Sequence, residues 1–205
     1  MAARNSKDVD LLAEAFALLA ERGWRGFSPT ELARRTDRTL AQVQELLPCR
    51  AALLGRLARR VDAQMLDLKA AELDGLSPRE RVFELIMRRF DAMAPFKAGL
   101  RVLARQAPGD LGLLGAAACN LRRLSGSLLD AAETGEPALA QAIGRKVLGA
   151  IYGRVFQVWL DDDTPDLART LAELDRRLQQ GERLAHLARR WRPGRDDAAG
   201  DPARA

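Results

Sequence analysis

The chain has 205 residues, of which 47% are hydrophobic and 30% are charged, and its formal net charge is +5. These proportions are typical of a folded protein and argue against disorder. The length suffices for one sizeable core or for a small module joined to a larger one. The sequence has neither the ~18-residue apolar run of a membrane-spanning helix nor the apolar start of a secretory signal, so we expect a cytoplasmic protein.

Helix is favoured over strand along the whole chain. Ala, Leu and Arg dominate, aromatic residues make up only 5%, and few segments alternate with a period of two. We therefore predict an all-α fold.

Little in the sequence suggests an enzyme. The single histidine, His186, excludes a histidine cluster for a metal and a Ser-His-Asp set spread through the chain. Cys49 and Cys119 lack metal-type spacing and are expected to be reduced structural thiols. The acidic run 161–163 is expected to cap a helix rather than to bind metal, and no Gly-rich phosphate loop is present. We expect no catalytic residue, metal or cofactor.

The N-terminal segment predicts short helices. Apolar residues recur at helical spacing from about Lys7 to Glu21. Ser28-Pro29-Thr30-Glu31 combines a capping serine, a first-turn proline and the glutamate of a capping box, which predicts a helix over 29–35. Thr39-Leu40-Ala41-Gln42 offers a second capping box and predicts a third helix that ends before Pro48.

The pattern of the remaining residues predicts longer helices separated by turns that contain Pro, Gly and Asp. They are expected over residues 50–73, 77–93, 95–106, 111–132, 137–160 and 165–190.

Three short helices with a tight 36–38 connection are the arrangement of a helix-turn-helix. The second helix would brace the third, which would lie in the major groove, where glutamine can pair with adenine and arginines can reach phosphates. We expect contacts to double-stranded DNA from Arg25, Thr30, Arg34, Arg35, Arg38, Thr39, Leu40, Gln42, Gln44, Glu45 and Arg50.

The run from Leu11 to Leu54 resembles the DNA-binding domain of the tetracycline-repressor (TetR) family. The similarity is carried by Ala13-Glu14-Ala15-Phe16, by Leu19-Ala20-Glu21-Arg22-Gly23-Trp24 and by Glu31-Leu32-Ala33-Arg34-Arg35. The resemblance implies a homodimer, a groove-reading third helix and a variable C-terminal domain that often holds an effector.

The third helix departs from the family pattern, which usually has a small-Thr-Leu-Tyr-x-x-Phe run. Gln44 stands at the position of the phosphate-touching tyrosine, and Leu47 replaces the packing phenylalanine. Leu40 replaces a basic residue, whereas Arg50 keeps the cation expected at the start of the fourth helix.

The C-terminal half also resembles another TetR-like group, the lipid-binding accessory proteins of ubiquinone biosynthesis. The similarity rests on Arg79 to Met87, on Ala150-Ile151-Tyr152 and on Val158 to Leu171. It implies an apolar pocket for an isoprenoid or phospholipid, and membrane attachment through a C-terminal amphipathic helix.

Two features of the C-terminal half have alternative interpretations. Leucines and a tryptophan interleaved with arginines could make weak contact with an anionic membrane surface, or could pack within the protein or across a dimer: Leu178, Leu184, Leu187 and Trp191. Large apolar side chains could line a pocket for an apolar small molecule or lipid, or could be plain core: Phe83, Met87, Phe90, Met93, Phe96, Cys119, Tyr152, Phe156 and Trp159.

Dimerisation is expected through the last two long helices. Gly149, Ala150 and Gly153 would give a flat patch on which a symmetry mate completes a four-helix bundle.

We thus predict an N-terminal three-helix helix-turn-helix domain (1–50), a larger C-terminal helical bundle for ligand binding and dimerisation (51–192) and a disordered tail (193–205). The predicted function is a ligand-responsive, TetR-type regulator of transcription that acts as a repressor. The alternative is a TetR-fold lipid-binding accessory protein of quinone biosynthesis with a vestigial DNA-binding head.

Overall fold

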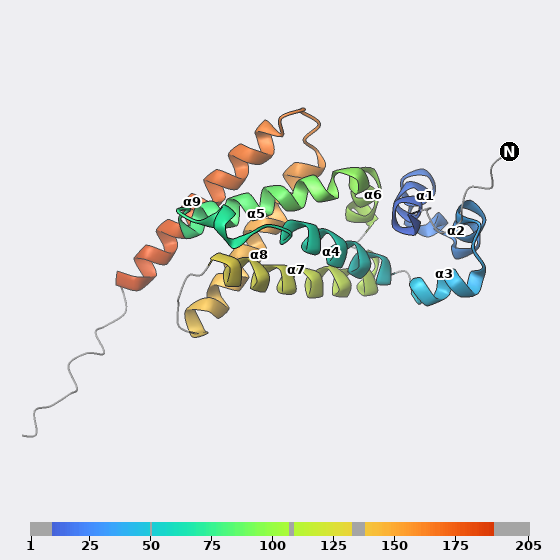
Figure 1. Cartoon of the computed structure of the whole chain (residues 1–205), viewed down its shortest axis with the longest axis horizontal. Coiled ribbons are helices and arrows are strands. Elements are labelled where there is room, and N and C mark those ends of the chain that lie inside the picture. Colours follow the sequence, from blue (N-terminus) through green and yellow to red (C-terminus); the bar gives the residue numbers. More distant parts are fainter. Residues whose placement is uncertain (1–9, 50, 107–108, 133–137, 191–205) are drawn as a thin grey trace, which may run out of the picture.

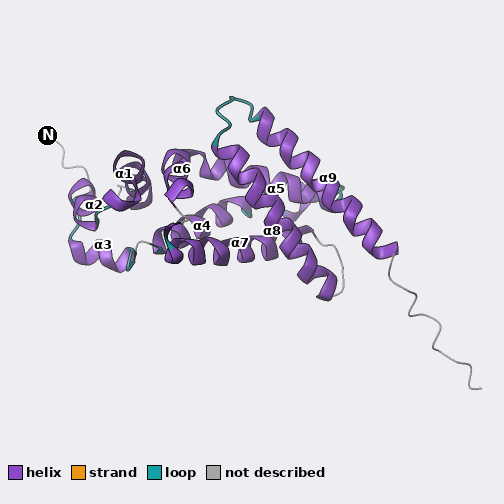
Figure 2. Cartoon of the chain, turned by 180° about the vertical axis from the view of Figure 1, so that it is seen from behind, coloured by secondary structure: helices purple, strands orange, loops and turns teal. Residues whose placement is uncertain are grey.

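The computed structural model describes residues 10–49, 51–106, 109–132 and 138–190, with the backbone alone for 138–140 and 184–190. Every regular element in these ranges is helical, which confirms the all-α prediction. Figures 1 and 2 show a small group of helices, α1–α3, at one end of an elongated molecule and the longer helices α4–α9 beside it. We call these parts the head and the body. Arg50, Trp191 and the predicted tail 193–205 lie outside the described residues.

The head consists of α1 (Leu11–Gly26), α2 (Pro29–Thr36) and α3 (Leu40–Leu46). Asp10 caps α1 by accepting a hydrogen bond from the Leu12 amide at 3.0 Å. The helix passes the expected end at Glu21 and kinks at Gly23, whose φ of 72° favours glycine because a side chain is strained there.

The predicted caps of α2 and α3 are present in the structure, with one difference. Ser28 caps α2, but the Glu31 carboxylate faces Arg34 and Arg35 instead of completing a capping box. The box of Thr39 and Gln42 at the start of α3 is complete. These caps satisfy amides that the first turn of a helix leaves unpaired.

The body consists of α4 (Ala52–Met65), α5 (Pro78–Met93), α6 (Lys97–Gln106), α7 (Leu111–Ala132), α8 (Ala138–Leu160) and α9 (Ala168–Arg190), with 3₁₀ turns at Ala70–Leu73 and Ala94–Phe96. The prediction of one helix over 50–73 is wrong. The buried stripe that holds α4 ends at Met65, and Leu66 and Asp67 are exposed, so nothing packs against a further turn.

One apolar core runs through both the head and the body. At their junction α1 lies against α6, and a Cβ on Gly99 would come within 2.6 Å of the Phe16 carbonyl oxygen. The rings of Phe16 and Phe96 meet edge to face with centroids 5.4 Å apart. Only a residue without a side chain allows this close approach at position 99.

Candidate DNA-binding surface

Helix α3 presents a polar face to solvent and a single apolar side to the head. Val43 is fully buried, and Leu47 just after the helix is 8% exposed, so these two side chains fix the orientation of α3. The residues expected to face outward are all exposed: Thr39, Leu40, Gln42, Gln44 and Glu45. The period of the sequence therefore placed this face correctly.

The two glutamines of α3 are in different situations. The side-chain oxygen Oε1 of Gln42 accepts a hydrogen bond from the Thr39 backbone amide at 2.9 Å, so this side chain is part of the cap. Within the described residues the Gln44 amide makes no hydrogen bond, and its side chain lines a cavity of about 310 Å³ between α3 and α4. Gln44 is thus the glutamine whose donor and acceptor are available for a base edge.

The arginines expected to reach phosphates also differ from one another. Arg34 is 74% exposed at its side chain, and among the described residues its one ionic partner is Glu31, at 3.5 Å. Arg35 instead donates to both carboxylate oxygens of Glu21 on α1, so it braces α2 against α1. This link between two helices could not be predicted, because local periodicity does not give partners 14 residues apart.

The remaining described candidates lie in α1, in α2 and in the turn between α2 and α3. Thr30 is exposed in the first turn of α2, and Arg25 is exposed in the last turn of α1. Arg38, in the turn between α2 and α3, is half-buried, and its Nε has no hydrogen-bond partner among the described residues. Arg50 lies outside the described residues.

Most residues proposed to line an apolar pocket of the body pack against one another. Phe90 stacks on Tyr152 and Trp159 with centroids 5.6 and 5.2 Å apart, and Phe156 stacks on Trp159 at 5.8 Å. Met93 is buried beside Tyr152, whereas Phe83 and Met87 are half-buried and pack against the apolar core.

Two of the pocket candidates do not lie in the ring cluster. Phe96 pairs with Phe16 at the junction of the head and the body. Cys119 is exposed on α7, because the turns of that helix point Leu113, Leu124 and Leu128 inward instead. Neither residue is placed to line a pocket inside the body.

A polar pair adjoins the ring cluster. Arg89 is only 5% exposed, and it donates to Asp62 of α4 at 2.9 Å and to the Tyr152 hydroxyl. Burial raises the pKa of Tyr152, although the Arg89 cation opposes this, so the hydroxyl stays protonated. The sequence predicted Tyr152 only as one of the large side chains of the body, and it gave no sign of Arg89.

The small-residue patch on α8 is only partly on the surface. Gly149 is buried against α7, where a Cβ would lie 3.2 Å from Ser125 Oγ, so its expected place in a dimer surface is wrong. Ala150 is exposed, and a Cβ on Gly153 would meet nothing within 4 Å. Ile143 and Val147 are large apolar side chains that the described part of α8 exposes, at 57% and 38%.

The three helices of the head, with α3 exposed, have the arrangement of a helix-turn-helix. Comparisons with known proteins specify the fold further. No family model and no curated protein matches the sequence. A TetR transcriptional regulator from Nitrosomonas europaea ATCC 19718 matches the structure with a TM-score of 0.71 at 23% identity, over 84% of this chain and 95% of that one.

Further solved structures agree. A TetR-family regulator from Streptomyces coelicolor matches with a TM-score of 0.61 at 16% identity, over 94% of this chain and 92% of that one. A TetR regulator from Rhodococcus sp. RHA1 matches with a TM-score of 0.59 at 16% identity, over 87% of this chain and 96% of that one. The chain therefore has the fold of TetR-type transcriptional regulators.

None of these comparisons supports the likeness to lipid-binding accessory proteins. No helix among the described residues is long and apolar enough to cross a membrane. Leu178 of α9, one of the leucines considered for membrane contact, is buried in the body at 7% exposure. Leu184 and Leu187 lie where only the backbone is described.

Proposed function

We propose that the chain is a DNA-binding regulator of transcription of the TetR type, a repressor that acts as a homodimer. The observation that carries this proposal is the orientation of α3. Its buried side is fixed by Val43, and its opposite side is a short exposed surface, polar except for Leu40, at the end of the molecule. A helix held in this way can enter the major groove.

Base readout is assigned chiefly to Gln44. Its free amide can donate to and accept from one adenine, whereas Gln42 is partly used by the cap. Arg34 and Thr30 on α2 would contact the phosphate backbone and set the register. Arg35 would act indirectly, because its pairing with Glu21 holds α2 and hence α3 in place.

Control of DNA binding would pass from the body to the head through the junction of α1 with α6. Two copies of α3 must lie about 34 Å apart to enter successive major grooves of one duplex. Because the core is continuous from head to body, a shift of α6 would carry α1 and change that spacing. An apolar ligand would act from the body, entering beside Phe83, Met87 and Phe156, which are half-buried and pack against the apolar core.

The proposal is tested by measuring binding of the purified protein to its own upstream DNA across a salt series. We expect one duplex to be preferred and its affinity to fall steeply with salt, since bound phosphates release counterions. Featureless DNA binding, together with retention on anionic vesicles and lipid that co-purifies with the protein, would contradict the proposal and support the lipid-binding alternative.

Two substitutions separate base readout from phosphate contact. Gln44→Ala should cost about tenfold in affinity for the preferred duplex and relax the preference at one base pair. Arg34→Ala should weaken all duplexes alike and reduce the salt slope by about one. Gln64→Ala removes the same exposed amide from the far end of α4 and is the matched control. If the first two variants behave identically, Gln44 does not read bases.

A further inference from the structure

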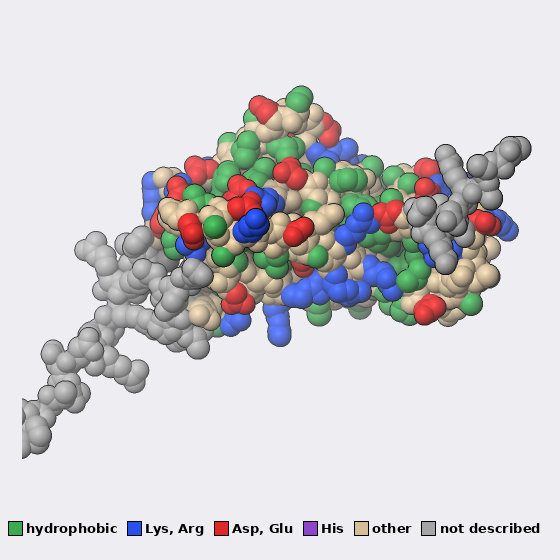
Figure 3. Space-filling model, viewed as in Figure 1, with side chains coloured by type: hydrophobic (Ala, Val, Ile, Leu, Met, Phe, Trp, Pro, Cys, Tyr) green, Lys and Arg blue, Asp and Glu red, His purple; other side chains and the backbone are tan. Residues whose placement is uncertain are grey.

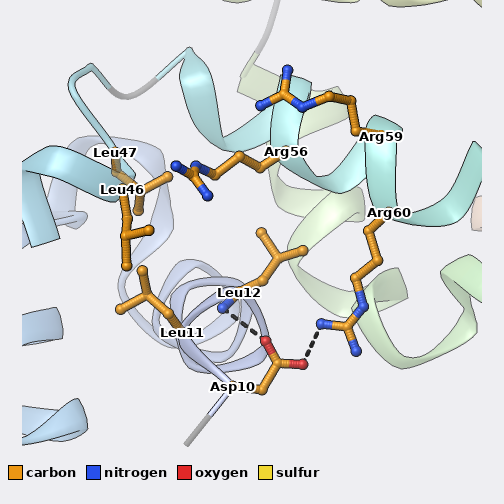
Figure 4. A pocket seen from close by; sticks show the side chains of 8 residues that line it. All are labelled: Asp10, Leu11, Leu12, Leu46, Leu47, Arg56, Arg59 and Arg60. Atoms are coloured by element: carbon orange, nitrogen blue, oxygen red, sulfur yellow. Dashed lines mark hydrogen bonds and ion pairs between the residues drawn. The ribbon is translucent and has the colours of Figure 1, made fainter. Parts of the chain in front are cut away.

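A cleft lies where the head meets the connecting helix α4, away from the ring cluster of the body. Its volume is about 300 Å³, at the lower end of the range for small-molecule pockets. The start of α1, the end of α3 and one side of α4 line it, as Figure 4 shows. Its lining residues are Asp10, Leu11, Leu12, Leu46, Leu47, Arg56, Arg59 and Arg60.

One wall of this head–connector cleft is apolar. Leu11, Leu12 and Leu46 are half-buried, and Leu47 is 8% exposed. These side chains come from both ends of the head and meet at the cleft (Figure 4). A short hydrocarbon chain bound against these leucines would bury apolar surface that is partly exposed to water in the free protein.

The other wall is cationic, and its charge is only partly neutralised. Figure 3 shows Lys and Arg gathered in a band beside the head, on the side of α4 and α7. Of the lining residues, Arg56, Arg59 and Arg60 are cations, and Asp10 is the one carboxylate facing them. The cleft therefore carries an excess of positive charge beside an apolar wall.

The three arginines are not equivalent. Arg60 is paired with Asp10, and its guanidinium also lies over the Phe96 ring, 5.5 Å from the centroid. Burial raises the pKa of Asp10, but the hydrogen bond from Arg60 helps to bring it below its usual value, so this pair is ionised. Arg56 and Arg59 make no ion pair or hydrogen bond within the described residues.

The positions of Arg56 and Arg59 suit a ligand. In Figure 4 the Arg56 side chain extends from α4 toward Leu46 and Leu47. The Arg59 side chain folds back along α4, with Nη1 3.6 Å from where a Cβ on Gly55 would lie. Within the described residues these two guanidiniums are not neutralised, and they line the same cleft as the apolar wall. They match an anion with a short apolar tail, because arginine binds carboxylates and phosphates through paired N–H donors.

We propose that the head–connector cleft binds a small amphiphilic anion, a carboxylate or phosphate monoester on a short acyl or alkyl chain. Arg56 and Arg59 hold the anionic group, and Leu11, Leu12 and Leu46 cover the tail. The ligand would touch the end of α3 and the connector at once. Its effect on DNA binding rests on the proposed function, whereas the binding itself does not.

Calorimetric titration of the full chain, without DNA, tests the site with chosen probes below their micelle concentrations. Octanoate and octyl phosphate should bind, and comparing them identifies the preferred anionic group. Octanol should bind at least about tenfold more weakly, and octyltrimethylammonium should not bind, because neither meets the guanidiniums. Equal binding of octanol and octanoate would overturn the proposal.

Variants locate the binding. Arg56→Gln with Arg59→Gln should weaken octanoate at least about tenfold, since two charge-assisted contacts are lost. Arg122→Gln with Arg145→Gln removes two exposed arginines from α7 and α8, and this control should bind octanoate unchanged. Leu46→Gln, at a half-buried position, should weaken octanoate without removing charge. Unchanged affinity in the first variant would place the octanoate elsewhere and overturn the assignment.

A different role for the two arginines is also measurable. If Arg56→Gln with Arg59→Gln lowers DNA affinity but leaves octanoate binding intact, the side chains are phosphate contacts and the cleft is not a ligand site. If octanoate binds as expected but no duplex is preferred, the cleft is a ligand site and the proposed function fails instead. The two results are distinguishable because the titration contains no DNA.

Discussion

Asp162 is a buried carboxylate that organises the turn between α8 and α9. It is fully buried and accepts hydrogen bonds from the Thr164 hydroxyl at 2.6 Å and from the amide and hydroxyl of Thr170 at 2.8 and 2.7 Å. Thr170 lies in the first turn of α9, whose amides have no partner in their own helix. The capping role expected for the run 161–163 is confirmed at this residue.

Removal of this carboxylate should destabilise the protein. Asp162→Ala leaves the buried Thr170 hydroxyl and amide without their acceptor, and we expect a loss of about 2 kcal/mol in the free energy of unfolding. Chemical denaturation measures it. Asp161→Ala, one residue earlier and exposed, is the control and should change stability by less than about 0.5 kcal/mol.

The same carboxylate should contribute to acid unfolding. Burial raises the pKa of Asp162, but the hydrogen bonds from Thr164 and Thr170 outweigh it and hold the pKa well below the ordinary value. Its stabilisation is therefore complete above the unfolded-state pKa of about 3.9 and is lost as the pH falls below it. Asp162→Asn should show a shallower fall in stability below about pH 4, and a slope equal to that of the parent chain would rule out this assignment.

At the scale of the elements, the head is fastened to the body by the side chain that follows the kink in α1. The Trp24 indole donates to Asp110 at 2.8 Å, and its amide donates to the Gln106 side chain at 2.9 Å. Asp110 also caps α7 through the Leu113 amide. The glycine at 23 makes this possible, because the left-handed φ there turns Trp24 toward the end of α6.

Trp24→Phe should loosen the head selectively. The Phe ring still fills much of the Trp24 site, but the hydrogen bond to the Asp110 carboxylate is lost. We expect this loss to lower the free energy of unfolding by roughly 1.5–3 kcal/mol. Amide hydrogen exchange should accelerate in α2 and α3 and stay unchanged in α8. Equal acceleration in all helices would show that Trp24 stabilises the molecule as a whole and does not fasten the head alone.

Another link joins α4 to α5 through a buried charge pair. Arg89 and Asp62 are 6% and 14% exposed at their side chains, so Asp62→Ala leaves an unpaired guanidinium inside the protein. We expect a loss of about 3–5 kcal/mol in the free energy of unfolding. The double variant with Arg89→Met should be less destabilised than Asp62→Ala alone, and the same denaturation measurement decides this.

Local sequence pattern predicted some features of the helices but not those that depend on how the helices pack. The bounds of α7 and the cap of α3 could be predicted, because each depends on residues within a few positions of one another. The pair of Arg35 with Glu21, the burial of Gly149 and the early end of α4 depend on which helices become neighbours. The head–connector cleft was missed for the same reason, since it combines residues from α1, α3 and α4.

For the whole molecule, the proposed homodimer requires a face that pairs with a second copy. Ile143, Val147 and Ala150 recur on one exposed side of α8, at spacings that align them along the helix. Beside them α9 approaches closely, because Gly181 leaves room for Ile151, whose Cδ1 would lie 3.2 Å from a Cβ at that position. Two helices packed side by side with an apolar edge are suited to complete a four-helix bundle across a two-fold axis.

Val147→Glu should therefore separate the copies, because it sets two carboxylates near the two-fold axis of an apolar contact. We expect a monomer by sedimentation and a loss of DNA affinity on the order of 100-fold, since two linked heads bind far more tightly than one. Leu114→Glu makes the same change at a similarly exposed leucine of α7, 41% against 38% for Val147, and should leave the dimer intact. A dimeric Val147→Glu with a monomeric Leu114→Glu would place the interface on α7. A Val147→Glu variant that stays dimeric and keeps full DNA affinity would exclude α8 from the interface.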